Sequence, residues 1–456
     1  MTTEDILPWF LLICFLIPLV EVIMMAVGAL WATIGYRRAP RKFTELIIQV
    51  TTVGKEPELV QRTVDTIRGY KLKMPYQIWV AIEPGHFVDY ENVDRVIVVP
   101  DDFECLPIDK ARALEFTRRL REELGLSRPD VKIILVDDDT LPSRRYVNLA
   151  YTGDYDLCQG VTVPNRWYAI GGWRHFLLSH LDDIRTRNCL VYCSCTQGML
   201  QKPLFVHGEG LCITGHAEKI VTWNRRIVAS DDLVFGTNAA HRALSWGYFH
   251  AAIQLVSPWS FRENLNQRWR WTWGNFDAIA SRDIMPRGAA IFKAAKYAMG
   301  LISVTASTTG LILLLTGQIK VPHQAHTVFL ISLSLWFFSY GISGWINAGG
   351  QPNREQAANR EAWGWFSRRV LWPLSGHSTA RVASVRFWGS RVMQGLAATI
   401  LTPMTALTPI FVIIYSVVRG RPKKFIMIKK ANDVMRLSAD NVHVEEAALG
   451  AVASRD

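Results

Sequence analysis

The sequence predicts an α/β domain with a mostly parallel sheet, set between apolar segments long enough to cross a membrane. Short β-branched runs alternate with helical stretches over residues 43–285, an order typical of parallel sheets covered on both faces. Long apolar runs stand before and after this region. The net charge is +11, and the basic residues cluster beside the apolar runs. This placement favours a membrane protein over one that binds nucleic acid.

The elements expected in the α/β domain follow one another from residue 46 to residue 136. Strands are expected at 46–52, 77–83, 95–100 and 131–136, with helices at 57–68 and 110–124. Ligands of such sheets bind beyond the carboxyl ends of the strands. Glu83 and Asp137 fall at two of these ends.

The apolar runs also predict how the chain is divided. A spanning helix needs about 20 apolar residues, and residues 1–36 supply one that ends in a basic cluster. By the positive-inside rule, the α/β domain that follows is cytoplasmic. We expect this domain over 37–285, with interfacial helices at its end, and two transmembrane helices in 286–348. A cytoplasmic interfacial region is expected in 349–390, followed by a Pro-broken transmembrane or re-entrant segment in 391–420. The last part, 421–456, is expected to be a basic segment with a flexible tail.

Two features of the membrane part stay open. Glu21 lies inside the first apolar run, where a carboxylate usually faces protein or water. A partner within the helix bundle and a functional role explain it equally well. In addition, four full spans would place the basic residues 419–430 outside, against the positive-inside rule. A segment 392–418 that is broken at its two prolines would resolve the conflict.

The seven cysteines predict reduced cytoplasmic thiols rather than a zinc site. The nearest set is Cys189, Cys193 and Cys195, which has no CxxC spacing and no nearby pair of histidines.

Three adjacent carboxylates, Asp137-Asp138-Asp139, follow the last expected strand. Adjacent carboxylates repel one another without a counter-ion, and a divalent metal supplies one while also binding a diphosphate. Alternate residues of an extended chain point the same way, so Asp137 and Asp139 would act together while Asp138 faces elsewhere. A solvated acidic loop is the alternative, but the apolar strand leading into the acids favours a site.

A second acidic motif, Ser230-Asp231-Asp232, precedes helical sequence. Two acids at a helix start ordinarily form an N-cap that the helix dipole favours. A helix start also holds a general base at fixed geometry. Taken alone, this motif does not decide between the two interpretations.

The third motif is Gln267-Arg268-Trp269-Arg270-Trp271. An interfacial aromatic-basic helix would explain it. Alternatively, Arg270 neutralises charge on a leaving diphosphate while Trp271 packs against a sugar or acceptor. Its order and distance after the two acidic motifs favour the second interpretation.

Three such motifs in this order, ahead of spanning helices, resemble the processive family-2 glycosyltransferases, in which they are written DxD, (T/E)ED and QxxRW. These enzymes include the cellulose, chitin and hyaluronan synthases. In particular the chain resembles the egghead group of β-1,4-mannosyltransferases, over roughly residues 47–275. The stretches that carry this likeness are 50–54, 57–60, 98–100, 110–114, 159–161, 182–183, 202–205, 231–232 and 267–268.

The resemblance implies a GT-A domain, which is Rossmann-like with a mostly parallel sheet. It also implies a nucleotide-sugar site, in which Glu83 holds the base, Lys110 contacts the diphosphate, and Asp137 and Asp139 bind a divalent metal, Mg²⁺ or Mn²⁺. The full set implied for the nucleotide sugar is Thr51, Glu83, Lys110, Asp137, Asp139, Gln267 and Arg268.

Catalytic roles are implied for Asp232, Asp231 and Arg270, with Asp232 taking the proton of the acceptor hydroxyl. Single displacement then inverts the sugar. Relatives usually carry Glu where this chain has Asp231, so the role of Asp231 is the less defined of the two.

Contacts with the acceptor are implied for Trp271, His207 and Glu209. The stretch His207-Gly208-Glu209-Gly210 replaces an aromatic-and-small sequence of the relatives. The acceptor and the donor sugar therefore stay open.

We expect an inverting, metal-dependent transferase that moves a hexose to a lipid-linked or growing glycan through a β-linkage. The donor would be GDP-mannose or a UDP-sugar of glucose or a related hexose. A processive polysaccharide synthase that secretes its polymer is the alternative, because spanning segments follow the domain. A non-enzymatic scaffold fits the intact Asp139, Asp232 and Arg270 poorly, and a transporter would need more spans. The expected partners are the donor, the glycan or glycolipid acceptor and membrane lipids, with no nucleic acid.

Overall fold

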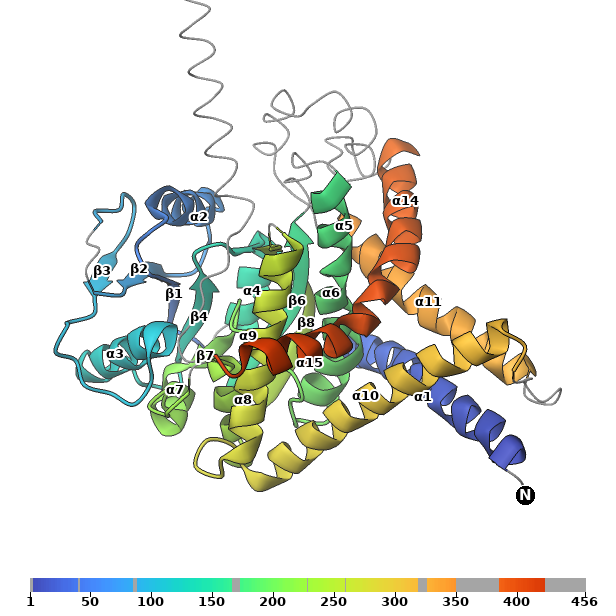
Figure 1. Cartoon of the computed structure of the whole chain (residues 1–456). Helices are drawn as coiled ribbons and strands as arrows, with labels where there is room; N and C mark the ends of the chain where they lie inside the picture. The colour runs from blue at the N-terminus through green and yellow to red at the C-terminus, as the bar shows by residue number, and fades with distance from the viewer. Residues whose placement is uncertain are drawn as a thin grey trace, which may run out of the picture.

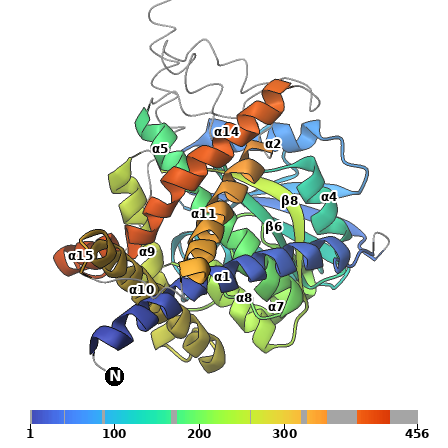
Figure 2. The same ribbon diagram turned by 90° about the vertical axis from the view of Figure 1, so that its right-hand side faces the viewer.

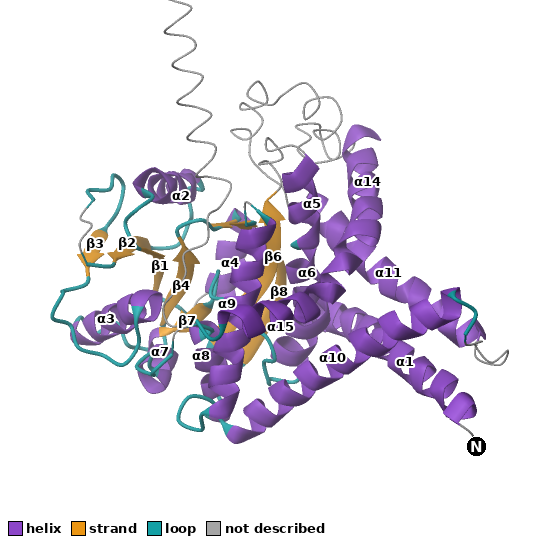
Figure 3. Cartoon of the chain, viewed as in Figure 1, coloured by secondary structure: helices purple, strands orange, loops and turns teal. Residues whose placement is uncertain are grey.

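The structure is a computed structural model that describes residues 3–39, 42–84, 88–165, 173–227, 229–258, 260–318, 326–349 and 385–422. An eight-stranded sheet carries helices on its faces, and long apolar helices lie together at one side (Figures 1 and 3). The strands are β1 (Glu45–Thr52), β2 (Tyr76–Ile82), β3 (Arg95–Val98), β4 (Val131–Asp137), β5 (Leu141–Pro142), β6 (Leu157–Asn165), β7 (Cys212–Thr214) and β8 (Trp246–Val256). Most of the expected interfacial region and the expected tail lie outside the described residues.

The helices divide between the α/β domain and the apolar side of the molecule. Within or beside the sheet lie α2 (Pro57–Gly69), α3 (Asp109–Glu123), α4 (Arg144–Thr152), α5 (Trp173–Leu181), α6 (Asp183–Asn188), the π-helix η2 (Cys189–Met199), α7 (Gly215–Val221), α8 (Asp231–His241) and α9 (Phe261–Ala280). The remaining helices are α1 (Thr3–Ile34), α10 (Arg287–Leu315), α11 (His326–Gly349), α14 (Val385–Leu401), the 3₁₀ segment η6 (Thr402–Leu407) and α15 (Thr408–Arg419).

The sheet is mixed, with strand order β3-β2-β1-β4-β7-β6-β8-β5. The first four strands in this order are parallel to one another, whereas β7 runs antiparallel to both β4 and β6. The register pairs Thr51 with Ala81 on one side and with Asp137 on the other. The carboxyl ends of β1, β2 and β4 therefore meet at one edge, as the sequence predicts.

Side-chain alternation along β1 explains why both faces of the sheet are buried. Leu46, Ile48 and Val50 belong to one apolar cluster, while Ile47 belongs to a second one on the other face. Successive side chains of a strand point to opposite faces, so a strand that is buried from Leu46 to Thr52 needs a layer of helices on each side. The expected strands and helices between residues 46 and 137 are all present within one or two residues.

Helix α1 packs against η2 and ties the α/β domain to the apolar helices. A Cβ at Gly28 would lie 2.2 Å from Ser194 Oγ, so the two helices approach closely only with glycine there. Trp31 Nε1 donates to the Gly198 carbonyl at 3.0 Å. The open question about Glu21 has a structural answer, because its carboxylate accepts from Arg187 Nη2 at 2.6 Å.

Three segments are long and apolar enough to cross a membrane: Leu16–Ile34, Thr327–Asn347 and Arg391–Arg419. Figure 2 shows α1, α11 and α14 on the same side of the molecule. The third segment is not straight, because the chain turns at η6, between α14 and α15 (Figure 1). Helix α10 is not among the three segments, so a span in this part of 286–348 stays a prediction.

Helix α15 lies along α9, the helix that carries the third sequence motif. Trp269 Nε1 donates to the Gly420 carbonyl at 3.1 Å, and Trp273 Nε1 donates to Ser416 Oγ at 3.1 Å. Tyr415 donates to Asn266 Oδ1 at 2.7 Å. Trp269, which belongs to the motif that suggested an interfacial helix, and Trp273 thus bond to the α15 segment of the same chain.

Candidate active site

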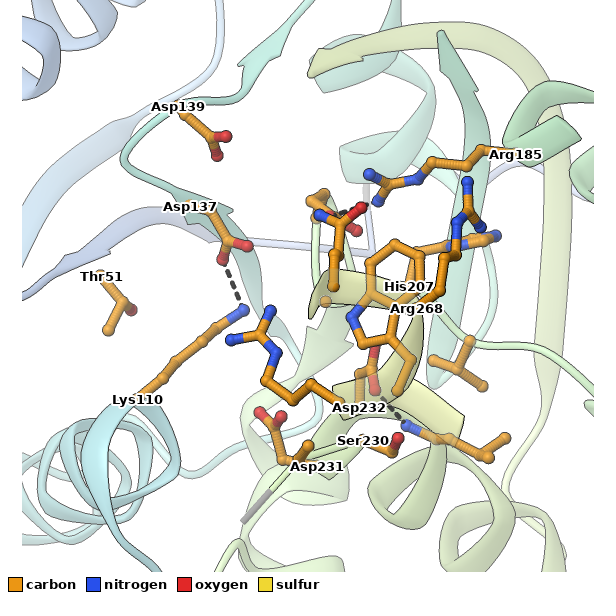
Figure 4. Close-up of a pocket in the computed structure, with 18 of the residues that line it drawn as sticks. Thr51, Lys110, Asp137, Asp139, Arg185, His207, Ser230, Asp231, Asp232 and Arg268 are labelled. Atoms are coloured by element: carbon orange, nitrogen blue, oxygen red, sulfur yellow. Dashed lines mark hydrogen bonds and ion pairs between the residues drawn. The ribbon is translucent and has the colours of Figure 1, made fainter. Parts of the chain in front are cut away.

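A cavity of about 610 Å³ lies at the edge where β1, β2 and β4 end, and α8 and α9 close its other sides. All three sequence motifs line it (Figure 4). The sequence-predicted residues on its wall are Thr51, Glu83, Lys110, Asp137, Asp139, His207, Glu209, Asp231, Asp232, Gln267, Arg268, Arg270 and Trp271. The fold therefore brings every predicted site residue to one cavity, although they come from different elements.

One wall gathers the residues at the strand ends. Lys110, in the first turn of α3, forms an ion pair with Asp137 at 2.5 Å. Burial lowers the pKa of Lys110, but Asp137 and Asp231 raise it more, so the pKa stays above its usual range. Thr51 and Asp139 lie beside this pair in Figure 4. The result is a fixed positive charge among carboxylates, where a diphosphate would be placed.

Asp138 also lines the cavity and accepts a hydrogen bond from Thr52 Oγ1 at 3.1 Å. The expectation that Asp138 faces elsewhere is therefore wrong. Strict alternation fails because β4 ends at Asp137, and the next two residues no longer follow the pleat of a strand.

Glu83 lies directly beyond β2 and faces Arg112 Nη1 at 3.4 Å. Burial raises the pKa of Glu83 to about 7, although Arg112 lowers it. Its Oε1 is buried and has no hydrogen-bond partner among the described residues. A buried acceptor without a donor is costly, so this oxygen is placed to accept from a ligand.

Asp231 and Asp232 occupy the first turn of α8. In Figure 4 they lie between the wall with Lys110 and Asp137 and the side of the cavity that carries Arg185 and Arg268. Ser230 precedes them in the left-handed conformation (φ 66°) and makes no side-chain cap hydrogen bond. Backbone strain of this kind is found at functional sites. Burial and the neighbouring Asp231 raise the pKa of Asp232 to about 7, against the opposing effect of Lys110. A pKa near neutrality suits a general base.

Two glycines allow this geometry. A Cβ at Gly208 would lie 2.7 Å from Lys110 Nζ and 3.6 Å from Asp232 Oδ2, so the loop passes close to both charged groups. A Cβ at Gly274 would lie 2.8 Å from the Cβ of Ala229. The lack of a side chain there lets α9 approach the residues just before α8.

Arg270 of α9 lines the same cavity as the carboxylates. Burial lowers its pKa, while Asp231, Asp137 and Glu209 oppose that effect. An arginine remains charged in such a site. Arg270 therefore adds a second cation near Lys110, where negative charge on a leaving diphosphate can be stabilised.

The opposite wall holds a charged cluster that sequence reasoning missed in part. Arg185 of α6 pairs with Glu209 at 2.5 Å and lies 5.0 Å over the Trp271 ring. Arg268 lies 5.0 Å over the same ring and pairs with buried Asp182 at 2.9 Å. Trp271 is thus held by two guanidinium groups. Arg268 lies across the cavity from Thr51 and Lys110 in Figure 4, and its predicted contact with the nucleotide sugar stays a prediction.

His207 has its ring directed toward thiols. Its Nε2 lies 3.1 Å from Cys189 Sγ, and its backbone N–H donates to Gln159 Oε1 at 3.2 Å. Its predicted contact with the acceptor stays a prediction. Glu209, two residues later, has its pKa lowered to about 2, because Arg185 and His207 outweigh the effect of burial.

Several polar side chains on the cavity wall have buried oxygens with no hydrogen-bond partner in the described part of the chain. Beside Glu83, they include Asp231 Oδ2, Gln267 Oε1 and Asn275 Oδ1. Sequence reasoning missed Asn275, and it missed Arg185, Lys293 and Tyr297 on the same wall. Lys293 and Tyr297 are spaced i, i+4 on α10, and this spacing on one helix face was the available signal.

Asp137 and Asp139 fit a Mg²⁺ or Mn²⁺ ion by the chemistry of their donors. Such ions take hard carboxylate oxygens, often one or two from the protein, and complete their shell with phosphate oxygens and water. Within the described residues no third ligand joins these two carboxylates in a ready-made cage. The arrangement therefore suits an ion that is shared with a diphosphate.

A family model described as Glycosyl transferase family group 2 matches residues 132–339. The chain is 22% identical over 337 residues to the β-1,4-mannosyltransferase bre-3 of Caenorhabditis elegans, covering 70% of this chain and 71% of that one. It is 22% identical over 312 residues to the β-1,4-mannosyltransferase egh of Drosophila melanogaster, covering 65% and 66%. A mannosyltransferase from Pyrobaculum calidifontis, solved with GDP-Man and Mn²⁺, aligns over 87% of this chain and 98% of its own, with 12% identity and a TM-score of 0.43.

Residues 132–339 thus match the glycosyltransferases of family group 2, in a chain with a mixed α/β sheet and long apolar helices. Within the family it is distantly related to the egghead and bre-3 β-1,4-mannosyltransferases. The family, the fold class and the enzyme class predicted from the sequence are thereby confirmed.

Proposed function

We propose that this glycosyltransferase is an inverting mannosyltransferase that takes mannose from GDP-mannose and forms a β-linkage on a lipid-linked or glycan acceptor. The observation that carries the proposal is the position of Asp232 between two unlike walls. One wall has the carboxylates and cations that suit a nucleotide diphosphate, and the other has an aromatic ring with fixed charges that suits a sugar. The names of the distant relatives favour mannose.

The donor would lie along the strand ends. Asp137 and Asp139 would hold a divalent ion, which supplies charge neutralisation for the diphosphate. Lys110, paired with Asp137 at 2.5 Å, and Arg270 would stabilise charge on the leaving group. Glu83 presents its unpartnered Oε1 to the base. Guanine has adjacent N–H donors on one edge, which a carboxylate accepts well.

Asp232 would remove the proton from the acceptor hydroxyl. The hydroxyl oxygen then forms its bond to the anomeric carbon while the bond from that carbon to the diphosphate breaks. Attack from the side opposite the leaving group inverts the anomeric centre. The guanidinium carbons of Arg185 and Arg268 each lie 5.0 Å from the centroid of the Trp271 ring. Trp271 would support the acceptor sugar, with Glu209 accepting from the sugar hydroxyl groups.

The three apolar segments would anchor the enzyme in a membrane, with the α/β domain on the cytoplasmic side because basic residues follow the first segment. An acceptor with a lipid anchor would then reach the cavity from the bilayer.

A donor screen tests the proposal. Full-length protein in detergent would be incubated with GDP-mannose, UDP-glucose, UDP-GlcNAc or UDP-glucuronate, with Mg²⁺ or Mn²⁺, and release of the nucleoside diphosphate measured. We expect GDP-mannose to be turned over at least about tenfold faster than each UDP-sugar. Preference for a UDP-sugar would contradict the proposed donor. Mass spectrometry of the product separates addition of one sugar from polymer synthesis, and a ladder of long products would contradict single transfer.

A further inference from the structure

A cluster of two thiols and an imidazole adjoins the wall of the cavity that carries Glu209, and its imidazole, His207, lines the cavity. Cys189 Sγ is 3.1 Å and Cys193 Sγ is 3.4 Å from Nε2 of His207. The three ligand atoms all lie within 4.8 Å of one another. Both cysteines have no exposed surface. Among the described residues, no other three His, Cys, Asp or Glu side chains gather in this way.

The fold brings these residues together from two elements. Cys189 and Cys193 are four residues apart on η2, so they share one face of that helix. His207 belongs to the loop before β7, where Gln159 holds its backbone through a bond from the His207 N–H at 3.2 Å. The sequence argued against zinc because the cysteines have no CxxC spacing and no nearby pair of histidines, whereas the fold supplies one histidine from a separate loop. Regular π-helix of this length is rare and is often found at functional sites.

The donors suit a thiophilic cation. Zinc binds thiolate sulfur at about 2.3 Å and imidazole nitrogen at about 2.0 Å, which puts ligand atoms roughly 3.5 Å apart around a tetrahedral ion. The observed separations of 3.1 and 3.4 Å are close to this value. A water would complete the shell.

We propose that Cys189, Cys193 and His207 bind one closed-shell thiophilic cation, Zn²⁺ or Cu⁺, at a site separate from Asp137 and Asp139. Binding replaces the protons of the thiols, which are released to solvent. The ion would tie η2 to the loop that carries Glu209 and so fix the wall of the cavity next to Arg185. Soft sulfur donors and hard carboxylates select different ions, so the two sites would not compete.

Metal analysis of the purified protein tests the proposal independently of activity. Full-length protein, expressed with added zinc and copper and purified in detergent, should carry about one equivalent of one of these ions per chain. The identity of the ion separates Zn²⁺ from Cu⁺. Cys193→Ser and His207→Gln should each lower the content about tenfold or more. Cys195→Ser, a buried thiol on the same helix outside the cluster, is the matched control and should keep it.

Asp139→Asn should also keep the zinc or copper, which would show that this ion is not the one proposed to bind Asp137 and Asp139 with the donor. Equal metal in wild type and Cys193→Ser would overturn the proposal. Because a variant can fail to fold, Co²⁺ is also added to chelator-stripped wild type. Thiolate ligands give an intense near-ultraviolet charge-transfer band, expected in wild type and Cys195→Ser. The absence of this band in wild type would overturn the proposal without any variant.

Discussion

Replacing Asp232 with Asn should remove activity and, at alkaline pH, raise stability. The amide keeps the shape of the side chain but cannot take the proton of the acceptor. General-base catalysis contributes about 10²- to 10⁴-fold, so we expect kcat to fall roughly 10³-fold, while the Kd for the nucleotide changes less than about threefold. Both values would be measured in full-length protein with radiolabelled donor.

The effect on stability follows from the direction of the pKa shift. Burial and Asp231 raise the pKa of Asp232 from 3.8 to about 7. As pH rises, the unfolded chain therefore loses this proton before the folded chain does. The resulting loss of folding stability is absent below about pH 4, grows with pH and is complete above about pH 7. The shift corresponds to at most about 4 kcal/mol. Because water reaches the cavity, we expect roughly 1–2 kcal/mol.

Thermal unfolding would therefore show Asp232→Asn melting a few degrees above wild type at about pH 8, with the difference shrinking at about pH 5. Asp101→Asn, at an exposed carboxylate, is the matched control and should change neither rate nor melting. Retention of more than about a tenth of kcat would show that another group is the base. A lower melting temperature at pH 8 would refute the electrostatic argument.

Three further predictions follow from the same cavity. In wild type, kcat/KM should rise about tenfold per pH unit up to about pH 7 and then level off as Asp232 ionises; a flat profile between pH 5 and 7 would exclude it as the base. Arg185→Met should raise the KM for the acceptor about tenfold and change the KM for the donor little, because the variant leaves Glu209 unpaired and removes the guanidinium over the Trp271 ring. Equal increases in the two KM values would contradict the assignment of Arg185 to the acceptor side. Gly274→Ala should lower kcat about tenfold, since its methyl would lie 2.8 Å from the Ala229 Cβ, whereas Gly288→Ala, with nothing within 4 Å, should not.

Strand and helix positions near the site could be predicted because they depend on local patterns. Apolar β-branched runs such as 46–52 and 131–136 form buried strands whichever neighbouring strands they pair with. The acids that follow them therefore had to lie at a strand end, and the parallel order of β1, β2 and β4 brought Thr51, Glu83 and Asp137 to one edge.

The contacts on the other wall could not be predicted in the same way. Arg185 and Glu209 are 24 residues apart, and neither belongs to a motif. Their pairing depends on where α6 and the loop before β7 pack. The same holds for Asp182, whose partner Arg268 comes from α9, 86 residues later.

The sequence by itself determined the class of the enzyme, the strand ends that carry its acids and the apolar segments that flank the domain, because residue type and spacing act over a few neighbours. Only the tertiary structure decided that Glu21 is paired with Arg187, that Asp138 also faces the cavity, and that His207 meets Cys189 and Cys193. These outcomes depend on the packing of elements distant in the chain, and periodicity carries no information about which side chains such packing places within a few ångströms.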